Sequence, residues 1–172
     1  MTVMKNIVLI GFMGVGKGST AREIVRRSGI VAIDTDDIVE SMENRKIKEI
    51  FKKEGEEYFR ALERRVGEWL ETSVRATLVS TGGGFYKVPN IKKIGKIVLL
   101  HSSFEGIYKR LKEHPDAKRK FKKRPLFQEI EKAKALYDIR VKEYKKIADV
   151  IIDTEGRSVE EVAKEIIKKV MK

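Results

Sequence analysis

The chain has 172 residues and a formal net charge of +12, from 38 Lys and Arg against 26 Asp and Glu. This length fits one domain of ordinary size, so we expect residues 1–172 to form a single domain. Cys is absent, which excludes disulfides and thiolate metal sites. Because no apolar run approaches the roughly 20 residues that span a bilayer and no signal peptide is recognisable, we expect a soluble, cytoplasmic protein without a membrane partner.

The cations are interleaved with acidic residues along predicted helices, as in the segment EGEEYFRALERRVGEWLE. This pattern is typical of solvated helical faces rich in ion pairs. Nucleic-acid binding would need aromatic side chains interleaved with the basic ones as a stacking platform, and the sequence lacks such a pattern. We therefore expect small polyanionic partners and no nucleic acid.

Five short β-branched runs alternate along the chain with longer segments of helical period. Strands are predicted at 6–10, 30–33, 78–81, 97–101 and 150–153. Helices are predicted at 17–28, 36–43, 46–53, 56–73, 104–113, 128–146 and 159–171, with Ser158 as the N-cap of the last. Because the strand runs are apolar almost throughout, each strand should be covered by helices on both faces, as in a three-layer α/β/α sandwich with a parallel sheet.

The first predicted strand runs into a glycine-rich segment, IVLIGFMGVGKGST. Its glycines let the backbone curl so that successive N–H groups point at phosphate oxygens, and Lys17 stands where the next helix begins. A strand, this loop, a lysine and a helix are the context that a P-loop requires, whereas a plain glycine-rich turn would not demand the lysine. The residues predicted to bind nucleotide phosphates are Gly11, Gly14, Val15, Gly16, Lys17, Gly18, Ser19 and Thr20.

The position directly after the P-loop lysine, where Ser or Thr is usual, is occupied by Gly18. The hydroxyl groups follow it, in Ser19 and Thr20. We therefore expect Mg²⁺ to be held chiefly by phosphates and water, with Ser19 or a further water in place of the usual hydroxyl.

Two acidic residues, Asp34 and Asp36, follow the second predicted strand in the segment VAIDTDDIVE. They lie at the carboxyl edge of the sheet, where open α/β sheets bind ligands, and their alternation points both side chains the same way. Beside a triphosphate, one carboxylate could hold a water of the magnesium shell while the other accepts a hydrogen bond from an attacking hydroxyl. Acidic residues at such places also cap helices, a role that we expect for Asp37.

Arg60 and Glu63 lie one helical turn apart, next to Phe59. They form either an ordinary ion pair or a guanidinium held rigidly for a substrate carboxylate. Further on, the segment LVSTGGGFY ends a strand in three glycines at 82–84. A ligand brought close to backbone N–H groups would explain these glycines, and a flexible turn is the alternative.

The segment KEHPDAKRKFKKRPLF, at 112–127, carries many cations, two prolines and no regular apolar period. We predict a mobile lid here, because phosphoryl transfer needs cations brought over the transferring group once the substrate is bound. A merely solvated loop is the alternative.

Six segments of the chain occur in the order seen in bacterial shikimate kinases: GFMGVGK, DTDDIVE, IFKKEGEEYFRALE, STGGG, KKRPLF and YDIRVKEYKKIAD. Together they resemble that family over nearly the whole chain, while gluconate kinases and nucleoside monophosphate kinases share only the first segment. The resemblance implies a P-loop fold of the nucleoside-monophosphate-kinase type, with a five-stranded parallel sheet, a lid and a substrate-binding region at about 34–63. It also implies transfer of the γ-phosphoryl group of ATP to the 3-hydroxyl of shikimate, with Mg²⁺, by an enzyme expected to be a monomer.

The resemblance also implies roles for individual residues. Asp36 would be the base, Lys17 would stabilise charge between the β and γ phosphates, and Arg124 would swing in with the lid. The implied shikimate site consists of Asp34, Asp36, Phe59, Arg60, Glu63, Gly82, Gly83, Gly84 and Arg140, and the implied further ATP contacts are Arg110, Arg124 and Arg157. Ser19 would bind the metal directly, and Asp34 would bind it through a water molecule.

The chain departs from the family pattern in two further places. The family often reads R-x-P-L-Y where this chain reads RVKEY, so Arg140 is assigned by its register. The lid is longer and more basic than usual. Two other functions stay open at this point: a kinase for another small hydroxylated acid or a nucleotide, and a nucleotide-dependent binding module.

Overall fold

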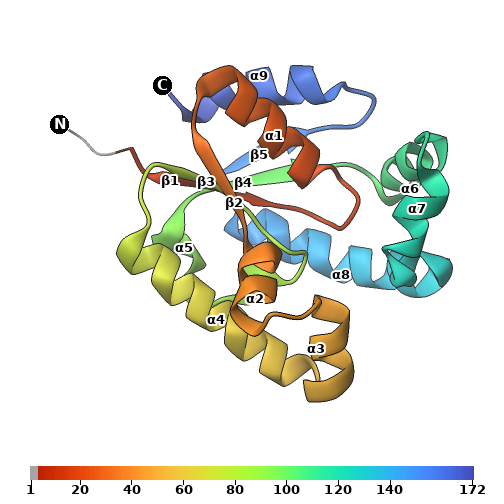
Figure 1. Ribbon diagram of the computed structural model, residues 1–172. Helices are drawn as coiled ribbons and strands as arrows, with labels where there is room; N and C mark the ends of the chain where they lie inside the picture. Colours follow the sequence, from red (N-terminus) through yellow and green to blue (C-terminus); the bar gives the residue numbers. More distant parts are fainter. Residues whose placement is uncertain (1–3) are drawn as a thin grey trace.

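The computed structural model describes residues 4–172, which form an α/β/α sandwich (Figure 1). Its five strands are β1 (Asn6–Ile10), β2 (Val31–Asp34), β3 (Thr77–Ser80), β4 (Gly95–His101) and β5 (Val150–Asp153). They pair in parallel in the order β2-β3-β1-β4-β5. The chain thus builds the sheet outward on both sides of β1, and ligands bind beyond the carboxyl ends of strands at such a switch point.

The helices cover both faces of the sheet. They are α1 (Lys17–Ser28), α2 (Thr35–Glu43), α3 (Ile47–Glu54), α4 (Glu56–Ser73), α5 (Ile91–Ile94), α6 (Phe104–Glu113), α7 (Ala117–Lys122), α8 (Ile130–Ile147) and α9 (Val159–Val170), with short 3₁₀ turns η1 (Phe85–Lys87) and η2 (Pro125–Gln128). α1 packs with α9 on one face, and α4, α5 and α8 lie on the other (Figure 1). No helix within 4–172 combines the length and the apolar character that a membrane crossing requires.

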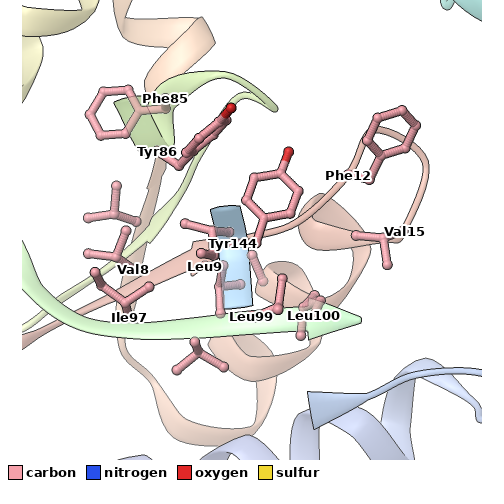
Figure 2. Packing of buried hydrophobic residues seen from close by; sticks show 14 of the residues in the cluster. Val8, Leu9, Phe12, Val15, Phe85, Tyr86, Ile97, Leu99, Leu100 and Tyr144 are labelled. Carbon is pink, nitrogen blue, oxygen red and sulfur yellow. The ribbon is translucent and has the colours of Figure 1, made fainter. Parts of the chain in front are cut away.

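The three central strands lie at the centre of the apolar core, to which the helices on both faces contribute. Val8 and Leu9 of β1 have no exposed surface, and Figure 2 shows them beside Ile97 of β4, with the rings of Tyr86 and Tyr144 nearby. The prediction that every strand is covered on both faces is wrong for the two edges of the sheet. Val31 in β2 is 66% exposed and Ile151 in β5 is 46% exposed, because these two strands form the edges of the sheet.

Every predicted element is present, with each end within two residues of the predicted bound, whereas several short elements were not predicted. Ser158 caps α9 as predicted: its hydroxyl accepts from the N–H of Glu161 (3.2 Å), whose carboxylate accepts from the N–H of Ser158 (2.8 Å). The predicted irregular segment at 112–127 instead contains α7 and η2, and its Phe127 is buried against Phe12 of the P-loop. A helix of one or two turns shows too few apolar positions for its period to be read.

Asn6 links two helices and a strand from a buried position at the start of β1. Its side chain is 1% exposed. The amide group donates to the carbonyl oxygens of Val74 (2.8 Å) and Ile94 (3.0 Å), and Asn6 Oδ1 accepts from the N–H of Thr77 (3.1 Å). One side chain thus satisfies backbone groups at the end of α4, the end of α5 and the start of β3.

Replacing Asn6 by Ala should lower the free energy of unfolding by about 3 kcal/mol, because it leaves buried backbone donors and acceptors without partners. Urea unfolding monitored by far-ultraviolet circular dichroism measures this change. Lys5→Ala, at the exposed neighbouring position, serves as the control and should change stability by less than about 0.5 kcal/mol. Equal losses in the two variants would contradict the structural role of the Asn6 amide.

Candidate active site

The P-loop between β1 and α1 has the backbone geometry that glycine permits. Gly11, Gly14 and Gly16 have φ angles of 154°, 84° and 105°, which L-residues with side chains rarely adopt. A Cβ atom at Gly11 would lie 2.7 Å from the carbonyl oxygen of Leu100 at the end of β4. The loop therefore passes so close to β4 that only glycine fits.

Lys17 curls back over this loop from the first position of α1. Its Nζ donates to the carbonyl oxygens of Gly11 (2.5 Å) and Phe12 (3.2 Å). Burial lowers the pKa of Lys17 to about 8, against the opposing effect of the carboxylates of Asp36 and Asp34. A phosphate group beside this ammonium would favour its charged form.

Asp34 fixes the turn from β2 into α2. Its extended backbone conformation is that of an N-cap, and its Oδ1 accepts from the N–H groups of Asp36 (2.8 Å) and Asp37 (3.3 Å). The predicted cap at Asp37 is therefore wrong: α2 begins at Thr35, one residue earlier than expected, so Asp37 is exposed within the first helical turn. Burial raises the pKa of Asp34 above its ordinary value.

Asp36 combines burial with like charges nearby. Burial raises its pKa to about 7, with further contributions from the negative charges of Asp34 and Glu63, while Lys17 opposes the shift. The backbone of the glycine triplet lies against this carboxylate, since a Cβ atom at Gly82 would come within 2.6 Å of Asp36 Oδ1. A carboxylate with a pKa near neutrality, in the first turn of the helix that follows a strand, has the properties of a general base.

Arg60 is held on α4 by two carboxylates. Its guanidinium contacts Glu63 (2.6 Å), which is 2% exposed, and Glu56 (3.1 Å). The buried ring of Phe59 lies 5.4 Å from the Arg60 guanidinium carbon. The other side of the guanidinium lies against the backbone of Gly84. The predicted ion pair is thus present, and it holds the guanidinium against the glycine triplet.

Arg140 reaches the same triplet from α8. It is 8% exposed, and within residues 4–172 its Nε has no hydrogen-bond partner. A Cβ atom at Gly83 would lie 2.9 Å from Arg140 Nη1. The hydroxyl of Tyr144, one turn further along α8, donates to the carbonyl oxygen of Gly83 (2.6 Å). Two guanidinium groups therefore flank neighbouring glycines, an arrangement suited to an organic anion.

One cavity of about 600 Å³ brings the P-loop, the carboxylates and the lid together. Its lining residues include Lys17, Ser19, Asp34, Asp36, Gly82 and Gly83, together with Arg110 of α6 and Lys120 and Arg124 of the lid. Phe59, Arg60, Glu63, Gly84 and Arg140 do not line it directly. Arg60 and Glu63 instead line a separate hollow of about 200 Å³. Arg140 and Arg60 lie against Gly83 and Gly84, next to Gly82 and Gly83 of the cavity lining.

A second cavity, of about 510 Å³, adjoins the P-loop on its other side. Val15, Arg110, Thr154 and Arg157 are among its lining residues. Arg110 lines both cavities, and its Nη1 donates to the carbonyl oxygen of Val15 (2.6 Å). Arg110 and Arg157, two of the ATP contacts implied by the sequence, thus line one cavity. The Arg157 side chain itself is held by Glu165 (2.6 Å).

Two groups of residues near the cavity were not predicted from the sequence. Tyr144 stands one helical turn after Arg140, which is a signal visible in the sequence, but its contact with Gly83 spans 61 residues. Arg22 contacts the Ser19 hydroxyl at 3.4 Å and lines the larger cavity together with Arg119, Lys120 and Lys123. Within the described part of the chain, no group of three or more His, Cys, Asp or Glu could hold a metal. Ser19 and Asp34 remain as oxygen donors beside the P-loop.

Comparisons with known proteins agree on one family. The family described as shikimate kinase matches residues 13–171. The shikimate kinase of Helicobacter hepaticus is 40% identical over 164 residues, covering 95% of this chain and 95% of that protein. The shikimate kinase of Thermodesulfovibrio yellowstonii is 40% identical over 172 residues, covering 96% and 94%. A solved structure, shikimate kinase from Acinetobacter baumannii in complex with shikimate, is similar with a TM-score of 0.83 and 30% identity, covering 98% of this chain and 93% of that one.

Replacing Asp36 by Asn should stabilise the folded protein at about pH 8, because folding disfavours the charged form of this carboxyl. The unfolded chain releases the proton near 3.8, whereas the folded protein holds it up to a pKa of about 7. Between these values the folded state binds more protons, so wild-type stability falls as the pH rises. The free energy of unfolding of Asp36→Asn at about pH 8 should exceed that of the wild type by on the order of 2 kcal/mol, and urea unfolding measures it.

The control is Asp37→Asn, the same substitution at the exposed neighbouring position. It should lose a few tenths of a kcal/mol, because a negative charge leaves the first turn of α2. The gain from Asp36→Asn should shrink as the pH falls toward about 4. A lower free energy of unfolding for Asp36→Asn than for the wild type at about pH 8 would contradict this prediction, because it would show that folding does not disfavour the charged carboxylate.

Proposed function

The chain belongs to the shikimate kinase family, and from that premise we propose that its active site transfers the γ-phosphoryl group of ATP to the 3-hydroxyl of shikimate, giving shikimate 3-phosphate and ADP. The protein is an ATP-dependent kinase that acts on a small hydroxylated acid. The observation that carries the proposal is the glycine triplet, which lies against Asp36 at Gly82 and against two guanidinium groups at Gly83 and Gly84. One short loop thus lies between the proposed base, Asp36, and the two arginines that would bind a carboxylate, Arg60 and Arg140.

In the proposed reaction Asp36 accepts the proton of the 3-hydroxyl group. The hydroxyl oxygen bonds to the γ-phosphorus as the bond from that phosphorus to the β–γ bridging oxygen breaks, and ADP leaves with the electron pair. The pKa of about 7 leaves Asp36 ionised in a large fraction of molecules near neutral pH while keeping it basic enough to take the proton. Little covalent chemistry falls to the protein, so most of the catalysis is positioning and charge stabilisation.

Lys17 and Arg124 are proposed to stabilise the transferring phosphoryl group from opposite sides. The two carbonyl contacts of Lys17 keep its ammonium over the P-loop, where charge develops between the β and γ phosphates. Arg124 lines the same cavity from the lid, and its Nη1 donates to the carbonyl oxygen of Lys120 (3.1 Å). Burial and the neighbouring Arg110 lower the pKa of Arg124, so an anion at this place would relieve an unfavourable environment.

Shikimate would be oriented by its carboxylate. Arg60 and Arg140 supply planar forks of N–H donors, which suit a carboxylate better than an ammonium group does. Glu63 and Phe59 hold Arg60 in place, and Tyr144 holds the Gly83 carbonyl so that the triplet backbone stays against Arg140. This pair favours an acid over a nucleotide as the acceptor, which argues against a nucleotide kinase.

The nucleotide base is proposed to bind in the cavity between Arg110 and the turn at 154–158. Magnesium fits the donors beside the P-loop, because the ion prefers oxygen ligands and the Asp34 Oδ2 atom has no hydrogen bond within the described residues. Ser19 and Asp34 would hold it, the latter through water, and when bound it neutralises phosphate charge. A monomeric state and a cytoplasmic location remain predictions.

The test is release of ADP by the purified protein with magnesium and ATP, measured with and without shikimate. Turnover should require shikimate, and Asp36→Asn should lower kcat by about 10²- to 10⁴-fold because the general base is lost. The affinity for ATP should change little in this variant. Release of ADP without any acceptor dependence would favour a nucleotide-dependent binding module, and intact turnover of Asp36→Asn would refute the proposed base.

Replacing Arg140 by Lys should raise KM for shikimate by about tenfold to a hundredfold while KM for ATP stays unchanged, because the charge remains but the fork of donors is lost. Steady-state kinetics with each substrate varied in turn measures this split. Arg65→Lys, an exposed position on α4, is the matched control and should leave both constants unchanged. An equal rise in both KM values would point to general distortion of the site.

A further inference from the structure

Arg140 differs from the other basic side chains in being buried without an acidic partner at contact distance. It is 8% exposed, and no other Lys or Arg within residues 4–172 is buried. None of the salt bridges in that range includes it, and its Nε has no hydrogen-bond partner there. Because a buried charge without a partner is costly, the structure around Arg140 must hold it in place until an anion binds.

Two residues that follow Arg140 on α8 attach this helix to the segment of the glycine triplet. Glu143 and Tyr144 stand three and four residues after Arg140, which places the three side chains on one face of the helix. The hydroxyl of Tyr144 donates to the carbonyl oxygen of Gly83 (2.6 Å). The hydroxyl of Tyr86 donates to Oε2 of Glu143. The helix that carries Arg140 is thus joined to the triplet segment by two hydrogen bonds that run in opposite directions.

Tyr86 is coupled to the glycine triplet through the backbone. It lies in η1, which begins directly after the triplet. The N–H of Phe85 donates to the carbonyl oxygen of Gly82 (3.1 Å), and the N–H of Lys87 donates to that of Gly84 (3.2 Å). Because these two turns join η1 to the triplet, a displacement of Tyr86 would displace the glycines as well.

The rings of Tyr86 and Tyr144 are packed edge to face, with centroids 4.9 Å apart and an interplanar angle of 78°. Figure 2 shows the two rings with both hydroxyl groups on the side away from β4. Burial and the hydrogen bond to Glu143 raise the pKa of Tyr86 to about 12. The positive charges of Arg140 and Arg60 oppose this shift. The Tyr86 hydroxyl therefore keeps its proton near neutral pH and remains a donor beside the two arginines.

The acidic member of this pair is a departure of this chain from the family pattern, because Glu143 stands where R-x-P-L-Y has Leu. We propose that Tyr86 and Glu143 are positioning residues for the acceptor, which fix the distance between the Arg140 guanidinium and the glycine triplet. The inference rests on the proposed function, since the ligand that enters this gap is the carboxylate of shikimate. Both residues act through Arg140 and the triplet backbone and do not contact the substrate themselves.

A purely electrostatic role of Glu143 and a positioning role predict opposite effects on shikimate binding. Shikimate carries a carboxylate, so loss of a nearby negative charge should strengthen its binding if charge alone matters. Positioning predicts that Glu143→Leu weakens binding. Glu143→Gln loses the charge but keeps an oxygen that can accept from Tyr86, so it should behave like the wild type. The measurements are calorimetric titration with shikimate in the absence of nucleotide and steady-state kinetics with each substrate varied in turn.

Tyr86→Phe and Glu143→Leu should each raise the Kd and the KM for shikimate by about threefold to tenfold, because each breaks the same hydrogen bond. For both variants kcat and the KM for ATP should stay within about twofold of the wild type, and Glu143→Gln should keep all constants within about twofold. The double variant Tyr86→Phe/Glu143→Leu should bind shikimate no more weakly than the weaker single variant. Glu131→Leu, the same substitution at an exposed position on α8, is the matched control and should leave all constants unchanged.

Tighter shikimate binding by Glu143→Leu, or unchanged binding by both single variants, would overturn the proposal. Effects that multiply in the double variant would overturn it as well, because the two residues would then act independently. An equal rise of both KM values in variants that circular dichroism shows to be folded would reduce the pair to a general structural role. The proposed function fails if the wild type neither binds shikimate nor turns it over, whereas the positioning role fails in a wild type that does both, so the two failures are distinguishable.

Discussion

The close passage of the P-loop beside strand β4 is the constraint on which the rest of the site depends. The backbone at Gly11 lies so near the carbonyl oxygen of Leu100 that no side chain fits between them. This contact fixes where β1 ends and where α1 begins, and so it fixes the position of Lys17. The carbonyl groups of the same loop then hold the Lys17 ammonium. A larger residue at Gly11 would have to move β1 and β4 apart, and these strands pair through the centre of the sheet.

A second feature of the site is the burial of charges that are not neutralised by ordinary ion pairs. Burial pushes the pKa of Lys17 down to about 8 and that of Asp36 up to about 7, so the two groups are brought toward each other in proton affinity. Such an arrangement costs folding stability, since both charged forms are disfavoured. It is useful only where a ligand completes the electrostatics, because phosphate favours the ammonium and a substrate hydroxyl uses the carboxylate. The site is therefore less stable than it could be, and more reactive.

Aromatic side chains connect the lid to the P-loop. Phe12 of the P-loop packs edge-on against Phe127 of the lid, with ring centroids 6.2 Å apart, and against Tyr137 of α8 at 5.3 Å. Tyr137 in turn donates from its hydroxyl to the carbonyl oxygen of Ser102 (2.6 Å), where β4 has ended. The base of the lid is thus part of the apolar core, while α7 beyond it shows no buried residue. Phe127 therefore anchors one end of the lid in the core, whereas α7 carries Lys and Arg side chains and has no buried residue.

The sequence by itself determined the local features of this protein. The apolar run of β1, the three P-loop glycines and Lys17 are adjacent in the chain, and the family segments follow in a recognisable order, so the fold type and the chemistry could be predicted. The bounds of α4 and α6 were also predictable, because each helix is long enough to show its period. α7, η1 and α5 were not, since an element of one or two turns offers too few positions.

Only the tertiary structure decided which distant residues meet and what their surroundings do to them. Arg60 and Arg140 are far apart in the sequence, and they converge because Gly83 and Gly84 leave room for both. The pKa of Asp36 likewise depends on burial and on charges from other elements, Glu63 of α4 and Lys17 of α1. Sequence carries residue identity and local spacing, whereas desolvation and long-range contact arise only when the sheet brings separate segments to one edge.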